Sequence, residues 1–246
     1  MLAFRAQALT RDGALAAFVV GTCTYASGGW AFTLVLLAFF IPSVALSRVG
    51  RRRKKQLVDI GKGGARDAWQ VLANGGIATA CALIAGSGGT TWIAAFAGSY
   101  AAATADTWGT EIGTLARGTP RSILTWQPIP AGLSGGVTLA GTAAEFAGAA
   151  WIAVAAALSL TPALRLIGPV CIGGIAGALV DSVLGATLQE LRRCPACGRT
   201  CETNPHACGT PTLRIRGLRG FSNDGVNFAA TLTGAAVAFA LCALEP

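Results

Sequence analysis

The sequence predicts an all-α fold, a polytopic membrane helix bundle with about seven transmembrane helices. Of its 246 residues, 53% are hydrophobic and only 12% are charged, and the mean hydropathy is +0.57. Soluble domains carry about twice that share of charged residues. Apolar segments close to the roughly 20 residues that cross hydrocarbon also recur along the whole chain. We therefore expect a single integral membrane domain over residues 1–246, with a cytoplasmic Cys/His loop at residues 190–223.

The expected helices are bounded by glycine-rich, polar or charged stretches. They cover approximately residues 13–29, 30–47, 68–87, 90–113, 135–158, 166–189 and 224–244. Only Gly28, Gly29 and Trp30 separate the first two, which leaves room for a tight hairpin. A secretory signal peptide is the alternative for the start, but no small-residue cleavage site precedes the next apolar segment. The 33 glycines predict helices that pack closely through small residues.

The basic residues predict the orientation in the membrane. If the N-terminus is cytoplasmic, all of the 19 Lys and Arg residues except Arg165 fall on the cytoplasmic side. Such an asymmetry is the positive-inside pattern, and it predicts a C-terminus outside. The net charge of +8 and the run RRRKK at residues 51–55 also have a nucleic-acid interpretation. Orientation and anionic headgroups explain them more simply, so we expect no nucleic-acid partner.

Acidic side chains interrupt the apolar helices near their cytoplasmic ends. A charge at mid-bilayer costs roughly 2.5–3.5 kcal/mol on insertion scales, so these acids are candidates for a functional site. Asp106 and Glu111 lie in the fourth expected helix, and Asp181 lies in the sixth. Glu145, in the fifth, belongs to no motif and either lines the same pocket or pairs with a basic group. Other polar residues expected at this depth are Asn74, Glu190, Asn223, Asp224 and Asn227.

Asp106 and Asp181 are the favoured pair for Mg²⁺. That ion accepts one or two carboxylates and completes its coordination with phosphate oxygens and water. Asp106 and Glu111 are five residues apart, roughly 140° around a helix, so they do not share one stripe. Glu111 is therefore expected to pair with Arg121 or to shape a nucleotide site. The alternative is that all these groups only hold helices together by polar contacts.

Two further segments carry candidate phosphate ligands. GTPRSILTWQPIPAGLSGG at residues 118–136 supplies glycine backbone N–H groups and an arginine, which suit phosphate oxygens. Its candidates are Thr119, Arg121, Ser134, Gly135 and Gly136. The pattern is not GxxxxGK[ST], so a P-loop is excluded, and a plain membrane turn is the alternative. NDGVN opens the last helix, where Asn223 or Asp224 serves as an N-cap, as a ligand, or as both, with Asn227 one turn later.

CPACGRTCETNPHAC at residues 194–208 predicts a zinc site. Cys194, Cys197, His206 and Cys208 provide four ligands of the kind that structural zinc prefers, and Cys201 is a spare. A disulfide is less favoured on the reducing side of the membrane. Four protein ligands leave no open position, which indicates a structural rather than a catalytic ion.

Several motifs in one order also carry a family resemblance. They are SGGW, SRVGRRRKK, QVLANGG, ADTWGTEIG, GTPR, PAGLSGG, ALVDSVLGA, the Cys/His loop and NDGVNF. At these motifs the chain resembles, over nearly its whole length, the integral membrane family known as domain of unknown function 92. That family includes transmembrane protein 19 and the plant chloroplast phytyl phosphate kinases.

The resemblance implies a phosphoryl transferase. The acids described above make Mg²⁺ its expected ion, and the predicted topology gives an inner or plasma membrane protein with its active site facing the cytoplasm. A nucleoside triphosphate, plausibly CTP, would phosphorylate an isoprenoid monophosphate such as phytyl or geranylgeranyl phosphate to its diphosphate. Asp106, Glu111, Asp181 and Arg121 would form the catalytic set. Two alternatives stay open: an ion-coupled transporter, since intramembrane acids in glycine-broken helices suit one, and a cytidylyltransferase acting on a lipid phosphate.

Overall fold

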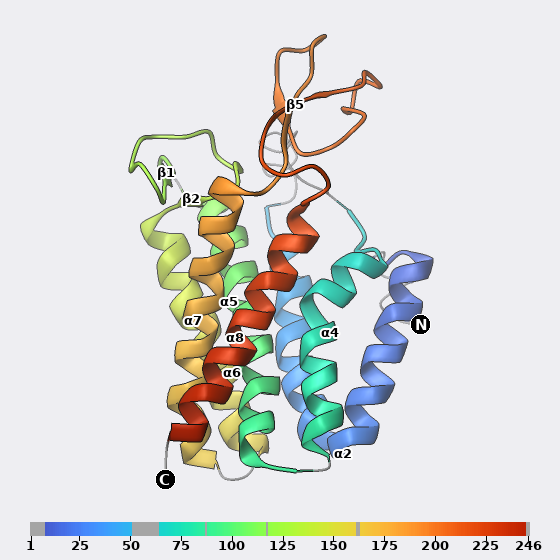
Figure 1. The fold of residues 1–246 in the computed structure, drawn as a ribbon, viewed down its shortest axis with the longest axis vertical. Coiled ribbons are helices and arrows are strands. Elements are labelled where there is room, and N and C mark those ends of the chain that lie inside the picture. Colours follow the sequence, from blue (N-terminus) through green and yellow to red (C-terminus); the bar gives the residue numbers. More distant parts are fainter. Residues whose placement is uncertain (1–7, 51–63, 87, 117, 161–162, 245–246) are drawn as a thin grey trace.

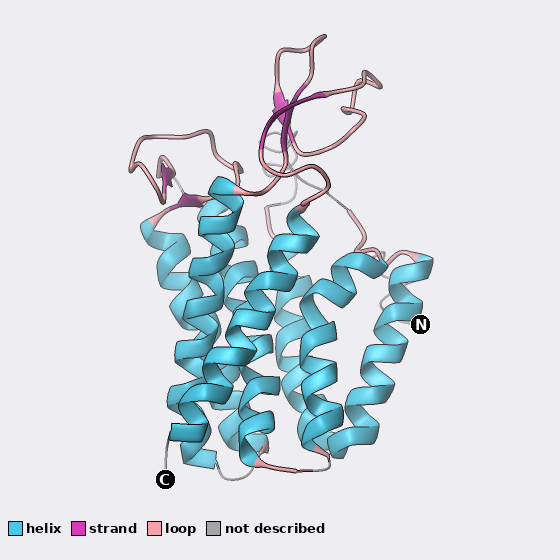
Figure 2. Cartoon of the chain, viewed as in Figure 1, coloured by secondary structure: helices cyan, strands magenta, loops and turns pink. Residues whose placement is uncertain are grey.

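The computed structural model describes residues 8–50, 64–86, 88–116, 118–160 and 163–244, and these form a helix bundle with small strands at one end (Figures 1 and 2). The described helices are α2 (Arg11–Arg48), α4 (Ala68–Ala85), α5 (Thr90–Leu115), α6 (Leu139–Ser159), α7 (Ala163–Thr187) and α8 (Asn223–Leu244). The predicted all-α membrane fold is therefore confirmed. By length and composition, five of the described helices are able to cross a membrane. The seven-span count and the orientation of the termini stay predictions.

The helix α2 is broken at the predicted Gly28–Gly29 position. Gly29 has φ 58° and ψ −142°, a conformation that side chains with a Cβ rarely adopt. Tyr25 and Trp30 meet edge to face across the break, with ring centroids 5.7 Å apart. After the break the chain turns back toward the end of the bundle from which α2 started (Figure 1). Despite this break, α2 is counted as one helix of 38 residues, and therefore as one of the five candidate spans.

The helix α5 is not among the five candidate spans because its sequence is less apolar. Its packing explains why a less apolar helix is stable inside the bundle. Residues 94–105 are buried without interruption, since α2, α4, α6, α7 and α8 all pack around α5. A helix enclosed by other helices has little contact with lipid, so it does not need a hydrophobic surface all round. It is therefore the element best placed to carry acids inside the bundle.

Small residues let α5, α7 and α8 approach one another closely. A Cβ added to Gly234 of α8 would lie 2.5 Å from the carbonyl oxygen of Gly98 on α5. A Cβ added to Gly173 of α7 would lie 2.6 Å from the carbonyl oxygen of Gly234. The abundant glycine thus packs these backbones together, as the composition predicts.

Two small sheets mark one end of the bundle, which we call the loop end (Figure 2). β1 (Arg121–Ser122) pairs antiparallel with β2 (Gly136–Val137), and β3 (Leu191–Arg193) lies between β4 (Thr200–Cys201) and β5 (Leu213–Arg216). The expected helix 135–158 begins later, because residues 136–137 form β2 and Thr138 caps α6 by accepting from the Gly141 N–H. The other ends of the expected helices agree with the structure to within about three residues.

Candidate functional site

A polar cavity of about 760 Å³ opens among the helices at the loop end. Residues of all six helices contribute to its wall, together with the turn that precedes α6 and the Cys/His loop. Its acidic residues are Asp106, Glu111, Glu145, Asp181 and Glu202, its basic residues are Arg48 and Arg66, and its amides are Gln70, Asn74, Asn223 and Asn227. Acids that stand far apart in the sequence therefore share one cavity.

Asp106 of α5 and Asp181 of α7 meet across the helix interface through a side-chain hydrogen bond. Thr110, one turn further along α5, also bonds to Asp106. The Oδ2 atom of Asp181 is buried and has no hydrogen-bond partner among the described residues. Two carboxyl groups in contact require a proton or a cation between them, and a buried carboxylate oxygen requires a partner.

Glu145 of α6 lies against α5 at Gly109. A Cβ on Gly109 would stand 2.6 Å from Cγ of Glu145, so the glycine provides the space for this side chain. The charge of Glu145 acts on both Asp106 and Asp181. The expectation that Glu145 lines the pocket agrees with its position in the cavity wall.

The turn Ser134–Gly136 closes one side of the cavity against α7. Gly135 has φ 82°, and an added Cβ would lie 2.4 Å from Cβ of Ala186, so the turn requires glycine both for its conformation and for its contact. The Ser134 hydroxyl donates to Oε1 of Glu202 at 2.5 Å. The three predicted turn residues Ser134, Gly135 and Gly136 all line the cavity.

The cavity holds two arginines that the motif analysis did not single out. Arg66 precedes α4, where Asp67 and Gln70 form a capping box, and its backbone carbonyl accepts from the Thr10 N–H at 3.0 Å. Burial lowers the pKa of the Arg66 guanidinium, while the charge of Glu111 raises it. Arg48 is the last residue of α2. Both belong to the basic stretch at residues 48–66. The sequence of this stretch predicts the orientation in the membrane, but it does not indicate which of its side chains face the cavity.

Three predicted residues lie elsewhere. Among the described residues, the cavity wall does not include Thr119, Arg121 or Asp224. Arg121 is exposed in β1 and donates from Nη1 to the carbonyl oxygen of Trp126 at 2.8 Å. By contrast, the predicted Asn74, Asn223 and Asn227 do line the cavity.

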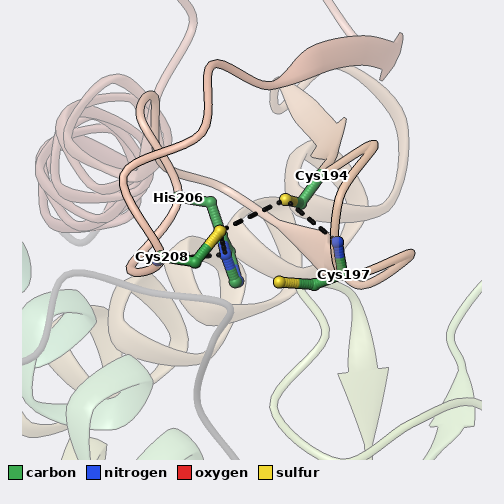
Figure 3. Close-up of side chains that lie close together, drawn as sticks. All are labelled: Cys194, Cys197, His206 and Cys208. Atoms are coloured by element: carbon green, nitrogen blue, oxygen red, sulfur yellow. Dashed lines mark hydrogen bonds between the residues drawn. The ribbon is translucent and has the colours of Figure 1, made fainter.

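The Cys/His loop brings its four predicted ligands together (Figure 3). The ligand atoms of Cys194, Cys197, His206 and Cys208 all lie within 4.8 Å of one another. Sγ of Cys194 is 3.6 Å from Sγ of Cys208, and Nδ1 of His206 is 3.0 Å from the latter. Tetrahedral zinc with bonds of about 2.3 Å places two sulfurs roughly 3.8 Å apart, so the thiol separation fits a metal. Cys201 is buried in β4 and is not part of this group.

Backbone turns hold these ligands in place. The N–H of Cys197 points to Sγ of Cys194 at 3.4 Å, and Gly198 closes the turn with φ 67° and an N–H bond to the Cys194 carbonyl. Hydrogen bonds with Thr210 and His206 lower the pKa of the Cys208 thiol to about 5. The thiolate is the form that binds metals. The group is therefore a candidate metal centre.

Comparisons with known proteins agree with the membrane fold. The family model described as integral membrane protein DUF92 matches residues 1–235. Protein PGR of Arabidopsis thaliana is 31% identical over 266 aligned positions, covering 94% of this chain and 89% of its own length. Uncharacterized membrane proteins of Methanocaldococcus jannaschii and Synechocystis are 33% and 31% identical, covering 76% and 71% of this chain and 77% and 69% of their own lengths. No solved structure matches the chain.

Proposed function

The chain belongs to the DUF92 family of integral membrane proteins, and on this premise we propose that it phosphorylates an isoprenoid monophosphate with a nucleoside triphosphate. The acceptor is phytyl or geranylgeranyl phosphate or a related lipid, the donor is plausibly CTP, and the products are the isoprenoid diphosphate and the nucleoside diphosphate. The contact between Asp106 and Asp181, with its unpartnered carboxylate oxygen, carries the proposal.

The donor atoms in the cavity suit Mg²⁺. Asp106 and Asp181 would hold the ion, and Mg²⁺ bound there would neutralise phosphate oxygens of the triphosphate. Glu145 and Asn227 line the same cavity and offer further oxygen atoms. An ion that keeps water and phosphate ligands needs a polar, roomy site, and a cavity of about 760 Å³ provides one.

The remaining cavity residues suit phosphates and their charge. Arg66 and Arg48 would bind phosphate oxygens, since guanidinium groups make strong bidentate contacts with them. The backbone of Ser134–Gly136 would pack against a phosphate, because glycines allow such an approach. The lipid tail would leave the cavity between helices toward hydrocarbon.

The reaction then needs little beyond position and charge. An oxygen of the acceptor phosphate attacks the γ-phosphorus, a new P–O bond forms, and the bond from the γ-phosphorus to the β–γ bridging oxygen breaks. The acceptor phosphate is already anionic, so no general base is required. Holding two phosphorylated substrates together and stabilising the charge of the transferred group are the main contributions in this chemistry.

The Cys/His group is proposed to bind structural Zn²⁺ through Cys194, Cys197, His206 and Cys208. Four protein ligands in one short loop leave no place for substrate. We further propose that the cavity faces the cytoplasm, as the positive-inside pattern indicates.

The proposal is tested with purified protein in detergent, Mg²⁺, labelled CTP or ATP, and a panel of isoprenoid phosphates. We expect isoprenoid diphosphate as product and its loss in Asp106→Asn. The matched control is Asp12→Asn, an exposed acid at the start of α2 that does not line the cavity.

Other outcomes point to the alternatives. Nucleoside label entering the lipid, with release of pyrophosphate, would indicate a cytidylyltransferase. Absence of turnover with every donor, together with ion-coupled uptake in vesicles, would exclude the kinase and favour a transporter.

A further inference from the structure

The Cys/His loop contributes an acid to the cavity that no motif assigns. Glu202 follows β4 directly and lines the cavity wall. It accepts the hydrogen bond from Ser134 of the glycine turn, 68 residues earlier in the chain. Its charge also acts on Asp181. The loop therefore reaches into the same polar space as the Asp106–Asp181 pair.

The candidate metal ligands and Glu202 share one small ribbon. Cys194 follows β3 immediately, and Cys201 in β4 stands opposite Arg192 of β3. On the far side of Glu202, the carbonyl oxygen of Thr203 accepts from the hydroxyl of Thr212 at 3.0 Å. Strand pairing before Glu202 and this bond after it fix the backbone that carries the carboxylate.

The ribbon is attached to the end of α7, the helix that carries Asp181. Arg216 of β5 donates from Nη2 to the carbonyl oxygen of Gly185 at 3.0 Å, and the N–H of Leu218 bonds to the carbonyl of Leu188. The charge of Arg216 also acts on Glu202. An exposed loop of this length has little apolar core of its own. Metal bound by the four ligands would therefore be the main interaction that orders residues 194–208.

We propose that metal bound at the Cys/His group positions Glu202 in the cavity and thereby raises the affinity of the cavity for a divalent cation. This inference rests on the proposed function, because the cation is the one assigned to Asp106 and Asp181. Glu202 acts as a positioning residue: it orients Ser134 and adds negative charge beside Asp181. Loss of the loop metal would loosen the segment 194–208 on both sides of β4, and the carboxylate of Glu202 would lose its fixed position in the cavity.

The test measures Mn²⁺ binding to the full-length protein in detergent by electron paramagnetic resonance, which needs no turnover. We expect Glu202→Gln to weaken Mn²⁺ binding by about 10- to 100-fold, as loss of a supporting carboxylate does at other metal sites. Glu202→Asp should restore part of the affinity, because it restores the charge. The control is Arg219→Gln, which changes one exposed charge of the same loop outside the cavity wall.

The coupling to the loop metal is tested with Cys197→Ala, which removes an exposed ligand. Elemental analysis should show loss of stoichiometric zinc, and Mn²⁺ binding should weaken as in Glu202→Gln. The double variant should bind no more weakly than either single variant. If Cys197→Ala aggregates, zinc is withdrawn from the wild type with a thiol-reactive mercurial and the same titration is made.

Equal Mn²⁺ affinity in wild type and Glu202→Gln, or wild-type affinity in zinc-free protein, would overturn the inference. If such protein still forms isoprenoid diphosphate, the proposed function stands and only the inference fails. If the wild type shows no saturable Mn²⁺ binding, the inference fails together with the cation part of the proposed function.

Discussion

At the scale of single residues, two arginines of the loop end differ in what their guanidinium groups reach. Arg66 lies in the cavity wall beside the charge of Glu111, whereas Arg121 is exposed and bonds to a backbone carbonyl. We therefore expect Arg66→Gln to raise KM for the nucleotide by about tenfold or more, the size of a lost charge-assisted hydrogen bond. Arg121→Gln should change it little. Steady-state kinetics of the two variants measure the difference.

The opposite order of the two effects on KM would contradict this prediction. A large effect of Arg121→Gln with a small effect of Arg66→Gln would support the sequence-based assignment of Arg121. It would also mean that the loop 118–136 moves toward the cavity when substrate binds.

Glu202 makes the stability of the protein depend on pH. Burial raises its pKa to about 7, above the usual value of 4.5, so the folded state binds the proton more tightly than the unfolded state. The contribution of Glu202 to stability is therefore greatest below about pH 4.5 and is lost as pH rises through 7, by up to about 3 kcal/mol. Glu202→Gln removes this term. In buffer without divalent cations, its melting temperature should exceed that of the wild type at pH 8 but not at pH 5.

A constant difference between the two proteins from pH 5 to pH 8 would contradict this assignment. Glu190→Gln provides a comparison of opposite sign. The pKa of Glu190 is lowered, chiefly by the hydrogen bond from the Gly220 N–H, so this variant should be less stable than the wild type at pH 8.

At the scale of elements, the contact among α5, α7 and α8 depends on glycine. We expect Gly234→Ala to destabilise the protein by about 1–3 kcal/mol, because an added Cβ would lie 2.5 Å from a carbonyl oxygen and the helices would have to separate. Gly21→Ala is the matched control, since nothing lies within 4 Å of its added Cβ. It should be neutral or slightly stabilising, as alanine favours helices. Melting temperatures in detergent, compared at one protein concentration, measure both.

The helices were predictable because hydropathy is a property of long segments, and the strands were not. Each apolar run averages over about 20 residues, so α4 begins where predicted at Ala68 and α8 ends where predicted at Leu244. β1 and β2 have only two residues each, too few for any alternation to be visible in the sequence.

At the scale of the whole molecule, the site residues that belong to a sequence pattern were predictable, and those that are placed only by tertiary folding were not. Asp106 and Asp181 were predictable, because an acid in an apolar helix is costly wherever it lies. The clustering of the four candidate metal ligands was predictable because their spacing is local. Glu202 and Arg66 lie in polar loops, where charged residues are common and do not indicate a site. Only the packing of those loops against the bundle brings the two side chains into the cavity wall.

The orientation of the whole molecule follows from its charge and is open to a direct test. All basic residues but Arg165 fall on the side of the loop end in the predicted topology, so this end should face the cytoplasm. A cysteine replacing Thr125, exposed in the loop between β1 and β2, should react with an impermeant maleimide in inverted membrane vesicles and not in intact cells. A cysteine replacing Gly88, exposed in the turn between α4 and α5 at the opposite end, should react in intact cells. Labelling of the wild-type protein measures the reaction of the native cysteines and is subtracted. Reversed labelling of both positions would place the cavity outside the cell, where nucleoside triphosphates are scarce, and would remove the basis for a kinase.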